Sequence, residues 1–157
     1  MKRIPLIAII VSLLGSTGVP AQNQKDDLAI EQAIMNGYTG WVNKDVALAT
    51  QDYADDTDWT NAFGDRVQSK EDLETLLTEI FSLDFVMAGK SENRFNDIDY
   101  LSPDIAVARS KTVRVGQKWG DNTAMDDRHI NHLRVFHKKN DQWEIVSHMI
   151  SQAWTKK

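Results

Sequence analysis

The spacing of the apolar residues changes near Gly89, and this change constrains the fold more than any other feature of the sequence. Before Gly89, apolar residues recur at intervals of three and four, which is the period of amphipathic helices. After Gly89, the chain consists of segments with strand composition, separated by turn residues. Helices followed by antiparallel strands indicate an α+β domain. We therefore expect a cone, in which N-terminal helices pack on one face of a curved, mainly antiparallel sheet.

The elements of the first half can be placed from their breaks and caps. A first helix is predicted to end at residues 43–45 (Asn-Lys-Asp), where a new cap starts a short helix over Val46–Tyr53. A strand over Asp55–Ala62 then leads into a turn. Ser69 starts a Ser-Lys-Glu-Asp sequence that resembles a capping box, with aspartate in the last position. The third helix follows and carries Leu73, Leu76, Leu77, Ile80 and Phe81 on one face.

The second half is predicted to form strands over Ser91–Tyr100, Ile105–Gly116, His129–Lys139 and Trp143–Ala153. Side chains alternate between the two faces of a strand. On the third of these strands His132, Arg134 and Phe136 share one face, and Asn131, Leu133 and Val135 share the other. On the last strand, simple alternation sets Val146, His148 and Ile150 opposite Trp143, Ile145, Ser147 and Met149. Both faces carry apolar residues, which indicates a sheet covered on both sides.

The first 21 residues have the pattern of a secretory signal peptide. Lys2 and Arg3 are followed by an apolar run over Leu6–Leu14 and then by the small residues of Val-Pro-Ala, which end at Ala21. The run is too short to span a bilayer. An uncleaved anchor is the alternative interpretation. The pattern predicts cleavage after Ala21 and an exported, periplasmic or secreted domain of residues 22–157 that has no membrane contact after cleavage.

Composition excludes several classes of function. The chain has no cysteine, so a disulfide framework is excluded. Its formal net charge is −5, which argues against nucleic acid and anionic membranes as partners. The histidines at positions 129, 132, 137 and 148 do not have the spacing of a helical zinc motif, and no glycine-rich phosphate loop is present. We therefore expect no metal and no cofactor.

Three stretches together carry a resemblance to a known superfamily. They are YTGWVNKDVALATQDYADDTDW, GDRVQSKEDL and LRVFHKKNDQW. In this order and spacing they resemble the nuclear transport factor 2-like superfamily, in its SnoaL-like and ketosteroid-isomerase-like branches. The third stretch is also similar to the final hairpin of the calcium/calmodulin kinase association domain. The resemblance covers nearly all of residues 22–157, and it implies a cone with an internal pocket and a dimer formed through the outer sheet face.

The ketosteroid-isomerase-like branch implies particular pocket residues. Its oxyanion-binding tyrosine corresponds to Tyr38, its proton-shuttling aspartate to Asn61, and its strand carboxylic acid to Asn131. An amide has no proton-transfer pKa in the accessible range, so Asn61 cannot act as a general base. The resemblance therefore implies a polar pocket that includes these residues, while the sequence argues against the isomerase chemistry itself.

Other residues are candidates for the missing base and for the pocket wall. His148 is expected to point inward, where a hydrated imidazole titrates near neutrality, and Asp127 is expected on the same face as Asn131. The alternative for His148 is a hydrogen-bonded core histidine. Trp59 shares a face with Asn61 and is expected either to form an aromatic wall or to pack in the core.

Arg109 is the candidate anion anchor, because the kinase association domain carries a pocket-lining arginine at the corresponding position. An inward arginine selects a carboxylate-bearing ligand through paired hydrogen bonds. The alternative is an arginine that faces solvent or a dimer interface, with Lys111 and Arg114 as neighbours.

Three functions remain open. The first is an exported, homodimeric SnoaL-like protein that binds a small organic molecule inside the cone. The second is an isomerase, dehydratase or hydrolase that uses His148 or Asp127 as its base. The third is an oligomerisation or interaction module that uses the outer sheet face. Because this fold supports many unrelated activities, the resemblance alone does not choose among them.

Overall fold

A computed structural model describes residues 21–153, except for the side chains of residues 21–23 and 93–96. Residues 1–20 of the expected signal peptide lie outside this range. The elements are α1 (Ala21–Asn43), α2 (Val46–Thr50), β1 (Tyr53–Thr60), β2 (Arg66–Val67), α3 (Lys70–Ser82), α4 (Asp84–Met87), β3 (Lys90–Ser102), β4 (Ile105–Val115), β5 (Arg128–Lys139) and β6 (Gln142–Ala153). Among these residues, no helix has the length and apolar character needed to cross a membrane.

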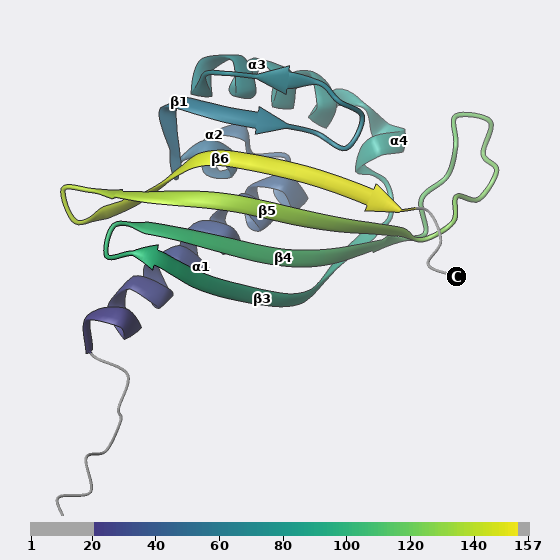
Figure 1. Cartoon of the computed structure of the whole chain (residues 1–157). Coiled ribbons are helices and arrows are strands. Elements are labelled where there is room, and N and C mark those ends of the chain that lie inside the picture. Colours follow the sequence, from purple (N-terminus) through teal and green to yellow (C-terminus); the bar gives the residue numbers. More distant parts are fainter. Residues whose placement is uncertain (1–20, 154–157) are drawn as a thin grey trace, which may run out of the picture.

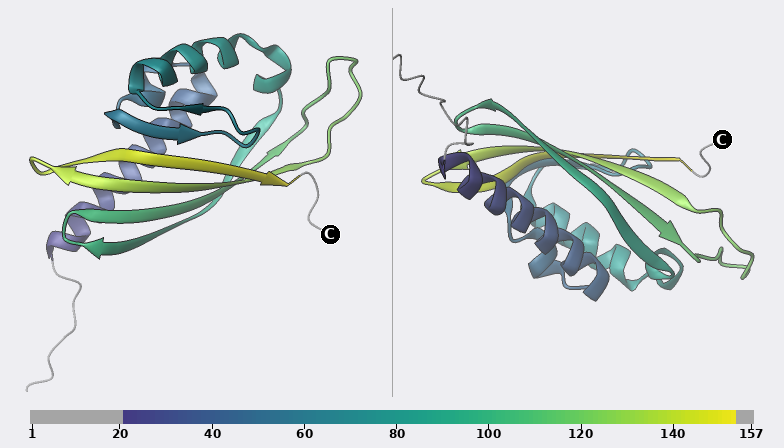
Figure 2. Two further views of the ribbon diagram at one scale, coloured as in Figure 1. Left: turned by 45° about the horizontal axis from the view of Figure 1, so that its top comes forward. Right: turned by 90° about the horizontal axis from the view of Figure 1, so that it is seen from below.

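The strands form one six-stranded sheet in the order β2-β1-β6-β5-β4-β3. Every neighbouring pair is antiparallel except β1 and β6, which run parallel. The helices gather on one face of the curved sheet (Figures 1 and 2). The predicted α+β class is therefore confirmed, as are the positions of the four long strands. The two-residue β2 and the four-residue α4 were not predicted, because segments of that length show no hydrophobic period.

Capping side chains fix the helix starts. Asp45 accepts a hydrogen bond from the Leu48 amide at 3.0 Å and caps α2, as the sequence predicted. Ser69 caps α3 in the same way, accepting from the Asp72 amide at 3.1 Å. These side chains satisfy amide groups that a helix start leaves without partners.

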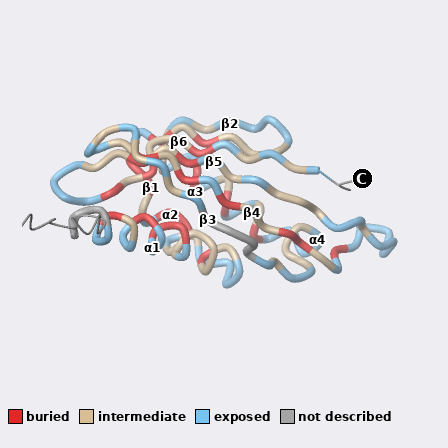
Figure 3. Tube along the Cα trace, turned by 60° about the horizontal axis from the view of Figure 1, so that its bottom comes forward, coloured by how far each residue is buried: buried red, intermediate tan, exposed pale blue. Residues whose placement is uncertain are grey.

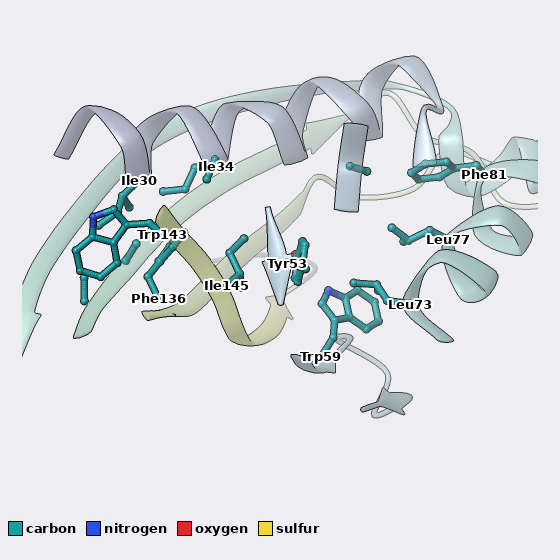
Figure 4. Packing of buried hydrophobic residues seen from close by; sticks show 14 residues of the cluster. Ile30, Ile34, Tyr53, Trp59, Leu73, Leu77, Phe81, Phe136, Trp143 and Ile145 are labelled. Atoms are coloured by element: carbon teal, nitrogen blue, oxygen red, sulfur yellow. The ribbon is translucent and has the colours of Figure 1, made fainter. Parts of the chain in front are cut away.

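The core lies between the helices and the inner face of the sheet (Figure 3). Figure 4 shows Trp143 of β6 beside Ile30 of α1, and Trp59 of β1 beside Leu73 of α3. The largest side chains that the structure buries completely include Phe136, Ile30 and Leu73. Burial of such a side chain stabilises the fold by about 1.5–3 kcal/mol each, so this layer provides the main driving force for folding.

A β-bulge in β6 changes which side chains face inward. Phe136 of β5 pairs with Ile145, whereas the preceding residue, Val135, pairs with Ser147. Val146 is therefore the extra residue of a bulge. As a result, Ile145 and His148 point to the same inner face, where both are buried. Simple alternation had set these two residues on opposite faces, and the bulge is the physical reason for the difference.

Candidate functional site

A chain of polar side chains crosses the inner face of the sheet. The Tyr53 hydroxyl lies 2.6 Å from His148 Nδ1, and His148 Nε2 lies 3.0 Å from His132 Nδ1. The Nε2 atom of His132 lies 3.5 Å from Thr112 Oγ1. The four residues come from β1, β6, β5 and β4, which are consecutive neighbours in the sheet. We call this chain of four side chains the relay.

The centre of the relay is held in a tightly packed environment. His148 is only 4% exposed, and its backbone pairs with Trp59 on one side and with Arg134 on the other. The Trp59 ring meets the imidazole edge-on, with the ring centroids 6.3 Å apart. Both ring nitrogens of His148 are hydrogen-bonded within the relay, Nδ1 to Tyr53 and Nε2 to His132.

Arg134 is a buried cation beside the relay. It donates a hydrogen bond to Ser110 Oγ at 2.8 Å and is 8% exposed. Its direct neighbour on β4 is Ala108, whose small side chain leaves space on the inner face for the guanidinium. Burial lowers the pKa of Arg134.

Burial and the charge of Arg134 determine the protonation of the relay. Burial, first, and then the guanidinium lower the pKa of both His132 and His148 well below 6.5, and each therefore stays neutral at neutral pH. For His148, the neighbouring His132 contributes in the same direction. Burial raises the pKa of Tyr53, while the charge of Arg134 and a hydrogen bond from it oppose that change. The resting relay thus consists of a neutral phenol and two neutral imidazoles.

Two further arginines lie opposite each other on the inner face, Arg114 on β4 and Arg128 on β5. Arg114 is 5% exposed and donates to the carbonyl of Ala88 at 3.0 Å and to Ser91 Oγ at 3.3 Å. Burial lowers the pKa of both arginines, and the charge of Arg128 lowers that of Arg114 further. The inner face therefore concentrates positive charge in a chain whose net charge is −5.

Solvent reaches the inner face at one end of the sheet. Towards the β5–β6 turn, the inward side chains of Phe136 and Ala106 are completely buried. Towards α4 and the connection between β4 and β5, four inward side chains are only half-buried, although Arg114 beside them is buried. We call this region the open end, and its half-buried residues are Thr112, Ile130, His132 and Ile150. It lies where β4 and β6 finish and β5 begins (Figure 1). The relay therefore runs from a buried phenol to a histidine and a threonine that are both half-buried.

Besides His148, two of the predicted site residues, Tyr38 and Trp59, lie on the inner side of the molecule. Tyr38 of α1 is half-buried and donates a hydrogen bond to the carbonyl of Ser91 at 2.7 Å, the same residue whose hydroxyl accepts from Arg114. Trp59 is 3% exposed and belongs to the core cluster, where it also contacts His148.

Asn61 and Asn131 lie elsewhere. The Asn61 side chain accepts from the amides of Phe63 and Asp65 and donates to the Asp65 carboxylate, so its amide holds the loop after β1 together. Asn131 is exposed on the outer face, since the inward positions of β5 are those of His132 and Arg134. The structure therefore does not bring these two amides together with Tyr38.

The remaining predicted residues are exposed. Arg109 lies on the outer face and donates to the Asp99 carboxylate at 2.6 Å. Asp127 lies in the connection that precedes β5. Within residues 21–153, no group of three metal-ligating side chains is arranged to hold a metal ion. An open hollow between α2 and α3, lined by Val46, Ala47, Glu71, Glu74, Thr75 and Thr78, is separate from the relay.

Sequence reasoning missed Tyr53, His132, Arg134 and Arg114 as site residues. The signal for two of them was present, because His132 and Arg134 alternate in step with Phe136, which is fully buried. Tyr53 was missed because it was assigned to the end of a helix, whereas it starts β1.

Comparison with known proteins identifies the fold. The sequence matches no family model and no curated protein. Among solved structures, the hexachlorocyclohexane dehydrochlorinase LinA-type3 from Novosphingobium barchaimii LL02 is similar, with a TM-score of 0.76 at 11% identity over 86% of this chain and 91% of that chain. A ketosteroid isomerase-like protein from Erwinia carotovora atroseptica SCRI1043 gives a TM-score of 0.66 at 16% identity, over 80% and 94%.

A nuclear transport factor 2-like protein from Shewanella oneidensis MR-1 gives a TM-score of 0.64 at 15% identity, over 80% of this chain and 98% of that chain. Identities this low establish the fold and leave the activity open. The resemblance inferred from the three sequence stretches is thereby confirmed at the level of the fold: this chain has the nuclear transport factor 2-like fold.

Proposed function

We propose that this protein binds a small organic anion, a carboxylate above all, on the inner face of its sheet near the open end. The observation that carries this proposal is the presence of two buried, inward-facing guanidiniums, Arg114 and Arg134, that are hydrogen-bonded only to neutral groups among residues 21–153. Their acceptors are the Ala88 carbonyl and the hydroxyls of Ser91 and Ser110.

A buried guanidinium without a counter-charge is energetically costly. Removing one ion from water costs several kcal/mol, which only a nearby opposite charge with good geometry offsets. No carboxylate in the described part of the chain forms an ion pair with Arg114 or Arg134. A ligand carboxylate would provide that counter-charge, and its two oxygens match the planar fork of a guanidinium.

The surroundings suit a small amphipathic molecule. Ile130 and Ile150 provide apolar surface at the open end, while Tyr38 and Arg128 provide polar groups nearby. Apolar walls with a few directed polar groups are the usual composition of a ligand site. The role of anion anchor, expected for Arg109, passes in this proposal to Arg114 and Arg134, because Arg109 is paired with Asp99 on the outer face.

The experiment compares a carboxylate with its neutral isostere. We expect pentanoate to raise the melting temperature of the protein and pentanamide to leave it unchanged. Arg134→Met should abolish the response, whereas Arg109→Met, the matched outer-face control, should retain it. Equal responses to acid and amide would exclude the proposal.

Acid–base catalysis is a second candidate, and the relay is the observation that favours it. The similar structures named as a dehydrochlorinase and as ketosteroid isomerase-like support small-molecule chemistry on this fold. The test is hydrogen exchange into 4-oxopentanoate in D2O, followed by proton NMR. Loss of the C–H signals next to the ketone faster than in buffer, abolished by His132→Phe, would support an enzyme; exchange at the buffer rate would remove this candidate.

We also propose that the chain is exported and that two copies associate through the outer sheet face. Export is supported by the leader pattern before Gln22, and an N-terminus at Gln22 in protein purified from outside the cytoplasm would test it. Association is supported by Leu133 and Met149, which pair across β5 and β6 and are 41% and 57% exposed. Large exposed apolar side chains at the centre of a sheet are typical of a covered surface.

A further inference from the structure

The relay must have a direction, because each hydrogen bond in it needs one donor and one acceptor. A neutral imidazole carries one proton, so one ring nitrogen donates and the other accepts. The bonds can therefore run from Tyr53 through His148 and His132 to Thr112, or in the reverse order. The first order leaves an N–H on His132 Nε2, and the second leaves a lone pair there.

Arg134 selects between the two directions. Its guanidinium has only donor groups, so the Tyr53 hydroxyl cannot donate to it. The nearby positive charge attracts the phenol oxygen and repels the phenol proton. That proton therefore points to His148 Nδ1, 2.6 Å from the hydroxyl oxygen. His148 then carries its own proton on Nε2 and donates to His132 Nδ1 at 3.0 Å, which leaves the His132 proton on Nε2.

The last link of the relay is loose. His132 Nε2 and Thr112 Oγ1 are 3.5 Å apart, beyond the usual range of about 2.7–3.2 Å for such a bond. Both residues are half-buried at the open end. The Nε2 position is thus the one ring position of the His132–His148 pair that is weakly engaged.

We propose that His132 donates a hydrogen bond from Nε2 to an oxygen of the bound ligand, with Arg134, Tyr53 and His148 as the positioning residues that keep its proton there. This inference rests on the proposed function for the location of the ligand and deepens it by naming the ligand class. The ligand carries a carbonyl or other acceptor oxygen in addition to its carboxylate, as a keto acid does. A group that can only donate, such as an ammonium, is rejected at this position.

The first experiment reads the proton positions without any ligand. Long-range ¹H–¹⁵N correlation spectra of the ¹⁵N-labelled protein at neutral pH distinguish the two neutral tautomers of each imidazole from the imidazolium. We expect His132 and His148 both to be neutral with the proton on Nε2. A proton on Nδ1 of either ring, or a protonated ring, would overturn the proposal.

Variants of Arg134 test what sets the direction. Arg134→Met removes the charge and should populate the Nδ1–H tautomer in both rings, while Arg134→Lys keeps the charge and should preserve the wild-type tautomers. Signals of His129 and His137, which lie on the other face of β5, should stay unchanged and report that the fold is intact. Wild-type tautomers in a folded Arg134→Met variant would contradict the role of Arg134; if that variant does not fold, the wild-type and Arg134→Lys spectra decide.

The second experiment measures the oxygen preference with two probes of equal chain length, 4-oxopentanoate and pentanoate. One added hydrogen bond should make 4-oxopentanoate bind about three- to tenfold more tightly, and His132→Phe should remove the difference. Equal affinity of the two probes for the wild type would overturn the proposal. If neither probe binds, the proposed anion site fails and the oxygen contact fails with it, whereas the tautomer spectra still report whether the relay has the inferred direction.

Discussion

Asp26 and Trp143 are joined by a hydrogen bond from the indole Nε1 to Oδ1 at 3.1 Å, which ties the start of α1 to the start of β6. The same carboxylate oxygen accepts from Lys138 Nζ at 2.8 Å. Both charged side chains are largely buried, at 7% and 12% exposure. Asp26 thereby anchors the start of α1 to the ends of β5 and β6 that meet at the β5–β6 turn, far from it along the chain.

Replacing Asp26 with alanine should lower the free energy of unfolding by about 3 kcal/mol, because it leaves the buried Lys138 ammonium without its partner. The matched control is Asp58→Ala, which removes the partner of Arg66 from a pair that is about half exposed. That change should cost clearly less stability, because solvent screens an exposed pair. Urea unfolding monitored by tryptophan fluorescence measures both, and similar losses in the two variants would contradict the assignment.

Two glycines of α1 should respond oppositely to alanine. A Cβ on Gly40 would lie 2.3 Å from the Ala49 backbone nitrogen, so Gly40→Ala should force α1 and α2 apart and destabilise the protein by about 1–3 kcal/mol. A Cβ on Gly37 would meet only the Ala49 carbonyl, at 3.8 Å. Gly37→Ala should therefore stabilise the helix by up to about 1 kcal/mol. Melting temperatures of the two variants check the difference in sign.

Stability should fall as the pH is lowered below 6.5. His132 and His148 have folded-state pKa values well below 6.5, because burial and Arg134 disfavour their charged forms. Below pH 6.5 the unfolded chain therefore binds protons that the folded protein does not, and the loss continues down to the lowered folded values. Each histidine contributes at most about 1.4 kcal/mol per pH unit.

Urea unfolding at pH 7.5, 6.0 and 5.0 measures this slope. Replacing both histidines with glutamine should flatten it between pH 6.5 and 5.0. An unchanged slope in the double variant would mean that other groups cause the loss.

Tyr53→Phe should cost about 1–3 kcal/mol, since it removes the hydroxyl partner of the buried His148 Nδ1. Tyr38→Phe removes a hydroxyl that bonds to a backbone carbonyl in a half-buried position, where water replaces it more easily. The second variant should lose clearly less stability than the first. Measuring the free energy of unfolding of both variants tests whether the Tyr53 hydroxyl contributes more stability than the Tyr38 hydroxyl.

Association through the outer face predicts a dimer in solution at micromolar concentration. Leu133→Lys should convert it to a monomer, because lysine would bring a charge into the apolar centre of the interface. Phe63→Lys, at an exposed residue of the loop after β1, is the control and should leave the mass unchanged. Sedimentation velocity distinguishes the two forms, and a monomeric wild-type protein would exclude this mode of assembly.

The fold could be predicted from sequence because its signals are local. Asp45 and Ser69 cap helices where short-range patterns placed them, and the long strands follow from alternation and turn residues. The parallel pairing of β1 with β6 could not be predicted in the same way, because it joins segments about ninety residues apart. No local pattern records such a contact.

The site was only partly predictable. The bulge at Val146 explains much of the difference between the predicted and the observed orientation of the β6 side chains. His148 was expected to face inward, but on a strand whose earlier residues Trp143 and Ile145 would then face outward; the extra residue lets all three face inward. Asn131 was placed in the pocket by correspondence with a family position, although alternation with Phe136 sets it on the outer face. Physical alternation within β5 was therefore the better guide than positional correspondence.

The relay takes one link from each of four consecutive strands, and this arrangement has a consequence for the whole sheet. Sliding any of these strands by a single residue would turn its contributing side chain to the opposite surface and interrupt the chain of hydrogen bonds. The imidazole NMR signals of His132 and His148 would therefore report the register between these strands. They would detect a register shift that leaves the overall shape of the protein unchanged.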